Sequence, residues 1–309
     1  MKKLRKSKIL VFIIIAAILL QAGYIGYSML GESLFGGKTP AGENTAPAAR
    51  NQISDEAGAA GDDKASGGYS YLKDETTIEI SPDILALIKK ADPDNYSKNI
   101  ENYKTLLKQL NVHIIFKNEL ERLVKSGYKL PDILTAYAFL NDCYGRLTDI
   151  EPLVKARSEG GKWPDIFKEY NVKNPEFVPS NFDSEYLEKL LQNPGLDQDA
   201  IMLADRISQK AKVKFAEVIN KKLEGYTWRY INAQYEIVNG QESSPHLSVT
   251  SDQLTKYANK WKLTEKQVIE GMTLASKLGK SQDYILGLVQ KGQTKEEIYS
   301  FAYQEKYYQ

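Results

Sequence analysis

The stretch that decides the fold runs from Val218 to Ile231 and reads VINKKLEGYTWRYI. An apolar residue, Val218, is followed seven positions later by Gly225, and Ile231 follows six positions after the glycine. Glycine adopts the left-handed backbone that ends many helices without steric cost, so this spacing predicts a short helix, a turn at Gly225 and a second helix. The apolar residues on either side of the turn would then pack across a helical hairpin.

The same frame of apolar residue, glycine and isoleucine occurs three more times: Leu120, Gly127, Ile133; Leu153, Gly160, Ile166; and Ile285, Gly292, Ile298. The four glycines are separated by 33, 65 and 67 residues, which indicates a step of about 33 residues with degenerate copies at Gly195 and Lys262. The pattern predicts tandem repeats of short helical hairpins. An ordinary helical protein with leucines in register and glycines at helix ends is the alternative.

Helical periodicity dominates the chain from Thr76 onward, so we predict an all-α fold. Proline-containing breaks at 171–180 and 239–248 divide it, because proline prevents a helix from continuing. The predicted helical lobes are 76–172, 182–238 and 250–309. Whether they stack into one solenoid or form three separate lobes is left open by the sequence.

Two sequence segments resemble known repeats: Gly161-Lys162-Trp163-Pro164-Asp165-Ile166 and Gly225-Tyr226-Thr227-Trp228-Arg229-Tyr230-Ile231. They resemble the Gly-x-Thr/Ser-Trp-x-x-Ile helical repeats of poorly characterised exported bacterial proteins. Lys295 replaces the tryptophan in the last copy. The resemblance implies an architecture and no activity.

The N-terminus has the pattern of a membrane anchor. Residues 1–8 include five basic side chains, and residues 9–31 carry no charge, a length that can cross a bilayer as a helix. We predict a cytoplasmic basic tail at 1–8 and a transmembrane anchor at 9–31. A cleaved signal peptide is the alternative, although Leu20-Gln21-Ala22 is a poor cleavage site.

Residues 32–75 are rich in glycine, alanine and proline, and they contain too few apolar side chains to form a core. They predict a disordered linker. We therefore expect a single-pass protein of the cell membrane with most of the chain outside the cytoplasm, or a secreted protein if the signal is cleaved.

Composition excludes several classes of function. Lys plus Arg number 41 against 40 Asp plus Glu, which argues against nucleic acid as a partner. Cys143 is the only cysteine, and His113 and His246 are the only histidines, so no metal, cofactor or catalytic triad is predicted. The turns at Gly279 and Gly292 resemble a DNA-binding helix-turn-helix, but structural hairpins use the same turn and the neutral charge favours them.

Acids beside aromatic residues, at Glu169, Glu185 and Glu236, are the candidates for glycan-cleaving chemistry. Most acids lie at predicted helix starts, as in Thr294-Lys295-Glu296-Glu297, where capping explains them without catalysis. No catalytic residue is therefore assigned.

The chain is rich in tyrosine, with 20 tyrosines against nine phenylalanines. Tyr299, Tyr303 and Tyr307 recur at four-residue spacing and predict an interaction stripe on the last helix. The alternative is that they cover a thin helical core. The sequence as a whole predicts a binding or scaffolding module of the bacterial envelope, with a protein or cell-wall partner, rather than an enzyme acting on peptidoglycan or another glycan.

Overall fold

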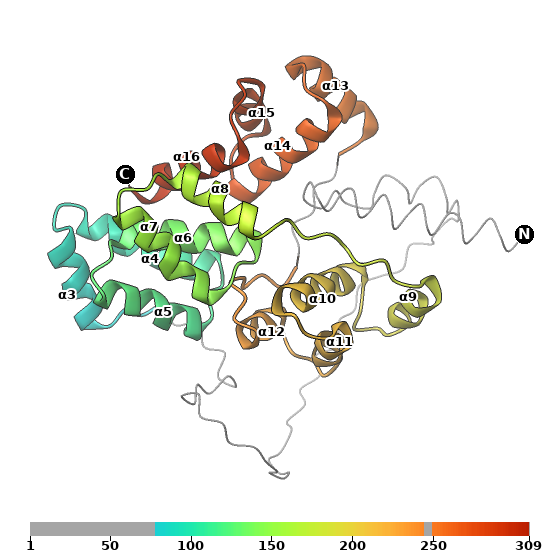
Figure 1. The fold of residues 1–309 in the computed structure, drawn as a ribbon, viewed down its shortest axis with the longest axis horizontal. Coiled ribbons are helices and arrows are strands. Elements are labelled where there is room, and N and C mark those ends of the chain that lie inside the picture. Colours follow the sequence, from blue (N-terminus) through green and yellow to red (C-terminus); the bar gives the residue numbers. More distant parts are fainter. Residues whose placement is uncertain (1–77, 244–248, 309) are drawn as a thin grey trace, which may run out of the picture.

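The computed structural model describes residues 78–243 and 249–308, and within them it contains helices and no β-strand (Figure 1). The predicted all-α fold is confirmed. The helices are α3 (Pro82–Ala91), α4 (Tyr96–Gln109), α5 (Ile114–Lys125), α6 (Leu130–Cys143), the 3-10 helix η1 (Leu147–Asp149), α7 (Ile150–Ser158), α8 (Trp163–Lys173), α9 (Ser184–Leu191), α10 (Gln198–Ala211), α11 (Phe215–Leu223), α12 (Trp228–Gln234), α13 (Ser251–Trp261), α14 (Glu265–Leu278), α15 (Gln282–Gln290) and α16 (Lys295–Tyr307).

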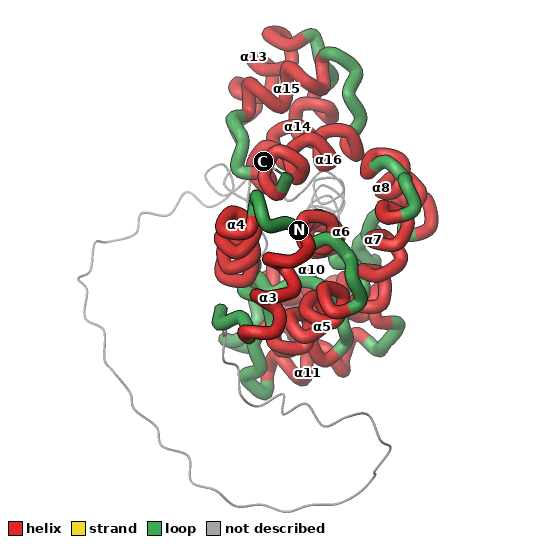
Figure 2. Tube along the Cα trace, turned by 90° about the vertical axis from the view of Figure 1, so that its left-hand side faces the viewer, coloured by secondary structure: helices red, strands yellow, loops and turns green. Residues whose placement is uncertain are grey.

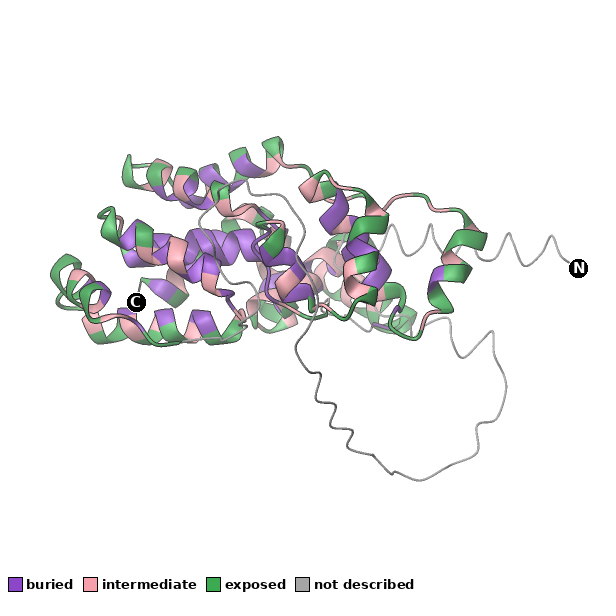
Figure 3. Cartoon of the chain, turned by 90° about the horizontal axis from the view of Figure 1, so that it is seen from below, coloured by how far each residue is buried: buried purple, intermediate pink, exposed green. Residues whose placement is uncertain are grey.

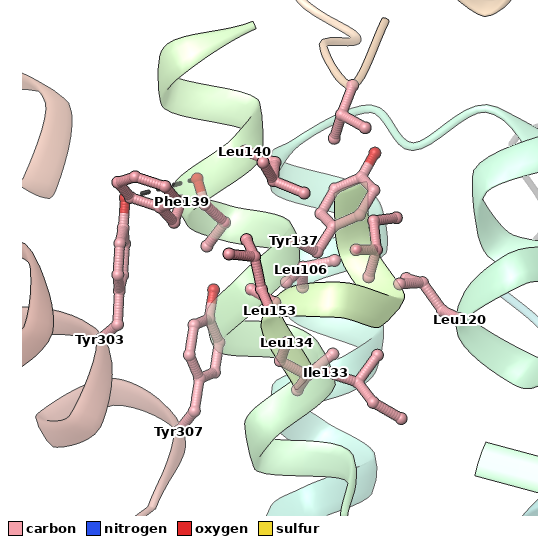
Figure 4. Close-up of a cluster of buried hydrophobic side chains, with 14 of the residues drawn as sticks. Leu106, Leu120, Ile133, Leu134, Tyr137, Phe139, Leu140, Leu153, Tyr303 and Tyr307 are labelled. Carbon is pink, nitrogen blue, oxygen red and sulfur yellow. Dashed lines mark hydrogen bonds between the residues drawn. The ribbon is translucent and has the colours of Figure 1, made fainter. Parts of the chain in front are cut away.

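Helix α6 lies at the centre of the largest core. It is buried on nearly all sides, as expected for a helix that other helices surround. Leu106 of α4, Leu120 of α5 and Leu153 of α7 converge on it, as Figure 4 shows. Buried residues gather on the helices in the middle of the molecule (Figure 3).

The glycines of the frame take the backbone conformation that a helical hairpin requires. Their φ angles are +88° at Gly127, +98° at Gly160, +91° at Gly225 and +82° at Gly292. At each of them the next N–H donates to the carbonyl five residues earlier, as Tyr226 does to Lys221 over 3.2 Å. This bond belongs to the Schellman motif, and it ends α5, α7, α11 and α15 in the same way.

At two other helix ends, lysine occupies the left-handed position of the same turn. Lys212 and Lys262 have φ of +58° and +54°, and the N–H that follows each donates to the carbonyl five residues back. Gly195, the other degenerate position of the frame, has no positive φ. The two degenerate copies therefore differ, because only the one at Lys262 keeps the turn.

The segment after α12 packs against the first lobe instead of acting as a connector. Val238 donates its N–H to the Gly145 carbonyl over 2.8 Å, and the Asn239 side chain donates to the Asn141 carbonyl over 3.1 Å. Ile237 and Val238 have no exposed surface. The break predicted at 239–248 therefore begins with residues fixed to the fold.

Arg229 of α12 strengthens this junction. It is 3% exposed, and its guanidinium donates to the carbonyls of Asn111 at 2.8 Å and Val112 at 3.0 Å, in the loop between α4 and α5. Gly240 also lies against this loop, where its carbonyl accepts a hydrogen bond from the Asn111 side chain over 3.0 Å. The first two predicted lobes therefore share an interface of buried hydrogen bonds.

Helix α16, the last helix of the predicted lobe 250–309, contacts helices of the predicted first lobe. It packs against α6 and α8, and its tyrosines belong to the same core as Phe139 and Phe167. Figure 2 also shows α16 beside α8, whereas α13, α14 and α15 extend away from the rest. The smallest core, around Val268, Met272 and Leu286, holds α13, α14 and α15 together.

None of the helices in the described part of the chain combines the length and the apolar character needed to cross a bilayer. The predicted tail at 1–8, anchor at 9–31 and linker at 32–75 lie outside the described residues.

Candidate functional site

A groove of about 650 Å³ lies between the end of α3 and the end of α16. Its walls come from the end of α3, the start of α4, the turn between α5 and α6, and the last two described residues. We call it the α3 groove. The residues that line it are Leu87, Ile88, Lys90, Ala91, Asp92, Asn95, Lys98, Asn99, Val124, Lys125, Gly127, Tyr128, Lys129, Leu130, Pro131, Tyr307 and Tyr308.

The local sequence explains why these segments meet. Serine followed by proline favours a helix start in the sequence, and α3 does begin at Pro82 with Ser81 as its N-cap; it stops at Asp92, whose φ of −150° is not helical. Gly127 then ends α5 and lets α6 begin three residues later. The two helix ends lie side by side because α3 packs on α5.

The floor of the α3 groove is apolar, since Ile88, Val124, Leu130 and Tyr307 line it and each is at most 6% exposed. Tyr308 forms part of the wall and is 37% exposed. Its hydroxyl is held by two buried residues, because it donates to the Asp132 carboxylate and accepts a hydrogen bond from Trp163 over 2.8 Å.

The rim of the groove is basic. Lys90, Lys98, Lys125 and Lys129 are all exposed there, against one acid, Asp92. Lys125 pairs with Asp83 at 3.1 Å, whereas the other three lysines form no ion pair with a described residue. The groove therefore carries a net positive charge on a folded region that is neutral as a whole.

Asp92 is an ionised carboxylate that accepts several hydrogen bonds. Burial opposes its charge, but hydrogen bonds from the Asn95 side chain at 3.1 Å, from the Asn95 N–H and from Asn99 at 3.1 Å outweigh burial and hold its pKa below the ordinary value. An acid with a lowered pKa does not donate a proton at neutral pH. The role visible for Asp92 is to fix the start of α4.

The tyrosine stripe predicted on the surface of the last helix is buried instead. Tyr299, Tyr303 and Tyr307 are 2%, 6% and 2% exposed, so the prediction of a surface interaction site is wrong. Figure 4 shows Tyr303 and Tyr307 directed from α16 toward α6. Neighbouring tyrosine rings stack along the helix at centroid distances of 5.6 and 6.4 Å, and the tyrosines of the stripe fill the space between α16, α6 and α8.

The tyrosines are in the core because the helix has a broad apolar face. The sequence spacing predicts that Ile298, Phe301 and Ala302 face the core. Ile298 and Ala302 are buried together with the tyrosines, whereas the prediction is wrong for Phe301, which is 50% exposed. The Tyr303 hydroxyl donates to Asp142 over 2.5 Å, so this polar tip has a partner inside the protein.

Asp142 is a half-buried acid that accepts the Tyr303 hydrogen bond, and it lies outside the α3 groove. Burial raises its pKa above the ordinary value, against the opposing effects of the Lys277 charge and the Tyr303 hydrogen bond. Burial also raises the pKa of the neighbouring Cys143 thiol to about 12, so that sulfur is a neutral thiol and a poor nucleophile.

Comparison with protein-family models, with curated proteins and with solved structures finds no match to this chain. The function must therefore be argued from the residues themselves.

The acids proposed from their tyrosine neighbours lie apart and exposed. Glu169 pairs with Lys173 at 2.6 Å, Glu185 with Lys189 at 3.2 Å, and Glu236 with Arg146 at 3.4 Å. The structure does not bring these acids together. Thr294 and Glu297 form the expected capping box at the start of α16.

His113 has a structural role at the start of α5. His113 is 1% exposed and caps α5, where Nδ1 accepts the Ile115 N–H over 3.3 Å, and burial lowers its pKa. His246 lies outside the described residues. Within the described ranges, no group of three or more His, Cys, Asp or Glu side chains could hold a metal ion.

Sequence reasoning missed the α3 groove. Its lysines come from three separate segments, and each looks like an ordinary solvated lysine in the sequence. The one available signal was the pair Lys89-Lys90 at the end of α3, which the favourable interaction of basic residues with a helix C-terminus also explains.

Proposed function

We propose that this chain is a membrane-tethered binding module of the bacterial cell envelope. In this proposal the basic tail at 1–8 and the anchor at 9–31 hold it in the cell membrane, and the segment at 32–75 links the helical part to the anchor outside the cytoplasm. The α3 groove is the place where the helical part binds its partner.

The α3 groove carries the proposal because it combines features of a binding site: an apolar floor, a rim of charged groups and walls fixed by buried residues. The alternative, a glycan-cleaving enzyme, needs an acid with a raised pKa inside a cleft. Among the described residues the groove acid Asp92 has a lowered pKa, and the acid with a raised pKa, Asp142, is packed against Tyr303 away from the groove.

The equivalent turns at Gly127, Gly160, Gly225 and Gly292 support tandem hairpin repeats as the architecture of the module. The repeats would provide a rigid support that places the groove at a distance from the membrane.

Two experiments test the proposal. A reporter fused after Gly68 in a bacterial host should be active only outside the cytoplasm, and the full chain should stay with the membrane in alkaline carbonate. A cytoplasmic reporter, or release of a shortened soluble form, would exclude the tethered topology.

The binding role is tested by co-sedimentation of the full chain with isolated envelope fragments. The triple variant Lys90→Glu, Lys98→Glu, Lys129→Glu should lose binding, because it reverses the charge of the rim. A matched variant, Lys168→Glu, Lys214→Glu, Lys256→Glu, changes three exposed lysines outside the groove and should bind normally. Equal binding by both variants would show that the groove is not the binding site.

A further inference from the structure

The α3 groove has two chemical properties that restrict its ligand. The floor is formed by the aliphatic side chains of Ile88, Val124 and Leu130 and by the ring of Tyr307, so it matches an alkyl or aromatic group. The rim offers exposed ammonium groups from Lys90, Lys98 and Lys129. None of the three forms an ion pair with a described residue, although the Lys129 charge helps to lower the pKa of Asp92. A ligand that satisfies both parts has an apolar body and an anionic head.

The volume fits such a molecule. About 650 Å³ lies inside the range of 300 to 1,000 Å³ that is typical of pockets for small organic ligands. A bare phosphate or carboxylate would leave the apolar floor in contact with water, and an uncharged apolar ligand would leave the lysines unused.

The acid in the lining cancels only part of the charge of the rim. Asp92 is ionised, and the Lys129 charge is one of the interactions that lower its pKa. Four lysines line the groove, and among the described residues only Lys125 has an ion-pair partner, Asp83. The remaining charge favours an anion and repels a cation of the same shape.

We propose that the α3 groove binds amphipathic anions, molecules that carry a carboxylate or phosphate head on an alkyl or aromatic body. This inference rests on the proposed function, because it names the ligand class of the same groove. The lysine ammonium groups hold the head, and the apolar floor holds the body.

The test uses the full chain in discs of neutral lipid, with octyl phosphate as the probe and empty discs to correct for partitioning. Binding is followed by calorimetry at low and high salt. Octyl phosphate should bind, and the Lys90→Glu, Lys98→Glu, Lys129→Glu variant should bind it at least about tenfold more weakly, which corresponds to about 1.4 kcal/mol. The Lys168→Glu, Lys214→Glu, Lys256→Glu control should stay within about twofold of the unmodified chain.

Two further probes test the anionic head and the apolar body of the ligand separately. Inorganic phosphate, which lacks the body, and octyl glucoside, which lacks the charge, should each bind more weakly than octyl phosphate. Equal binding of either probe, or an unchanged affinity in the rim variant, would overturn the inference. Equal circular dichroism spectra and melting temperatures of the two triple variants show that loss of binding is not loss of folding.

The test of the ligand class and the test of the proposed function can fail independently. Envelope fragments that bind while octyl phosphate does not would overturn the ligand class and leave the binding module in place. Octyl phosphate that binds while envelope fragments do not would support the ligand class and refute the envelope role.

Discussion

Replacing Gly240 by alanine adds one methyl group at the junction between the first two lobes, and the structure gives the size of the effect. A Cβ at Gly240 would lie 2.2 Å from the Asn111 carbonyl oxygen and 2.5 Å from that of Leu110. Both atoms are backbone, so no side-chain rotation relieves the overlap. The two segments must separate by roughly 1 Å to reach ordinary van der Waals distance.

That separation strains the hydrogen bond between Asn111 and Gly240 and the bonds from Arg229 to the same loop. Overpacking costs about 1 to 3 kcal/mol and a lost hydrogen bond about 1 kcal/mol, so we expect Gly240→Ala to destabilise the chain by about 3 kcal/mol. Gly225→Ala is the matched control. Its Cβ meets nothing within 4 Å, and only the left-handed backbone at φ +91° opposes it, at about 1 kcal/mol.

Urea unfolding of the full-length variants, followed by helical circular dichroism, measures both effects. The midpoint of Gly240→Ala should fall well below that of Gly225→Ala at a similar slope. Equal midpoints would refute the close approach of the two lobes on which the calculation depends.

Three other predictions follow from individual residues. Lys262→Gly should stabilise the chain by about 0.5 to 1 kcal/mol in the same urea assay, because glycine relieves the cost of φ +54° at a helix end; a loss of stability would contradict that geometry. Burial raises the pKa of Asp142 in the folded state. The contribution of this carboxyl group to the free energy of unfolding is therefore fully present below the unfolded-state pKa of about 4, and it is lost as the pH rises through the higher folded-state pKa. Asp142→Asn should therefore gain stability relative to the unmodified chain between pH 4 and 8, and a difference that does not change with pH would count against the assignment. The double variant Tyr299→Ser, Tyr303→Ser should lower the melting temperature strongly, because it empties space between α16, α6 and α8; unchanged melting would place those rings outside the core.

Local patterns in the sequence predicted local structure well. The positive φ of Gly127 and Gly225 follows from spacing alone, because a helix end is determined by the residues within one turn of it. The start of α3 at Ser81-Pro82 and the capping box of Thr294 have the same origin.

Long-range packing could not be predicted in this way. Tyrosine is amphipathic, so four-residue spacing of Tyr299, Tyr303 and Tyr307 fits a surface stripe and a buried face equally well. The choice is made by Phe139 and Phe167, which lie more than 100 residues away in the chain and stack within the same core. The α3 groove was missed for the same reason, since Lys90, Lys98 and Lys129 meet only after α3 packs on α5.

Hydrogen–deuterium exchange of the full chain, with and without isolated envelope fragments, tests the groove as the binding site most directly. The account predicts slower exchange on binding at residues 87–99 and 124–131, which form the walls of the α3 groove, and no change at α11 or α13. Protection confined to other helices, or no protection in a sample that has bound, would contradict it.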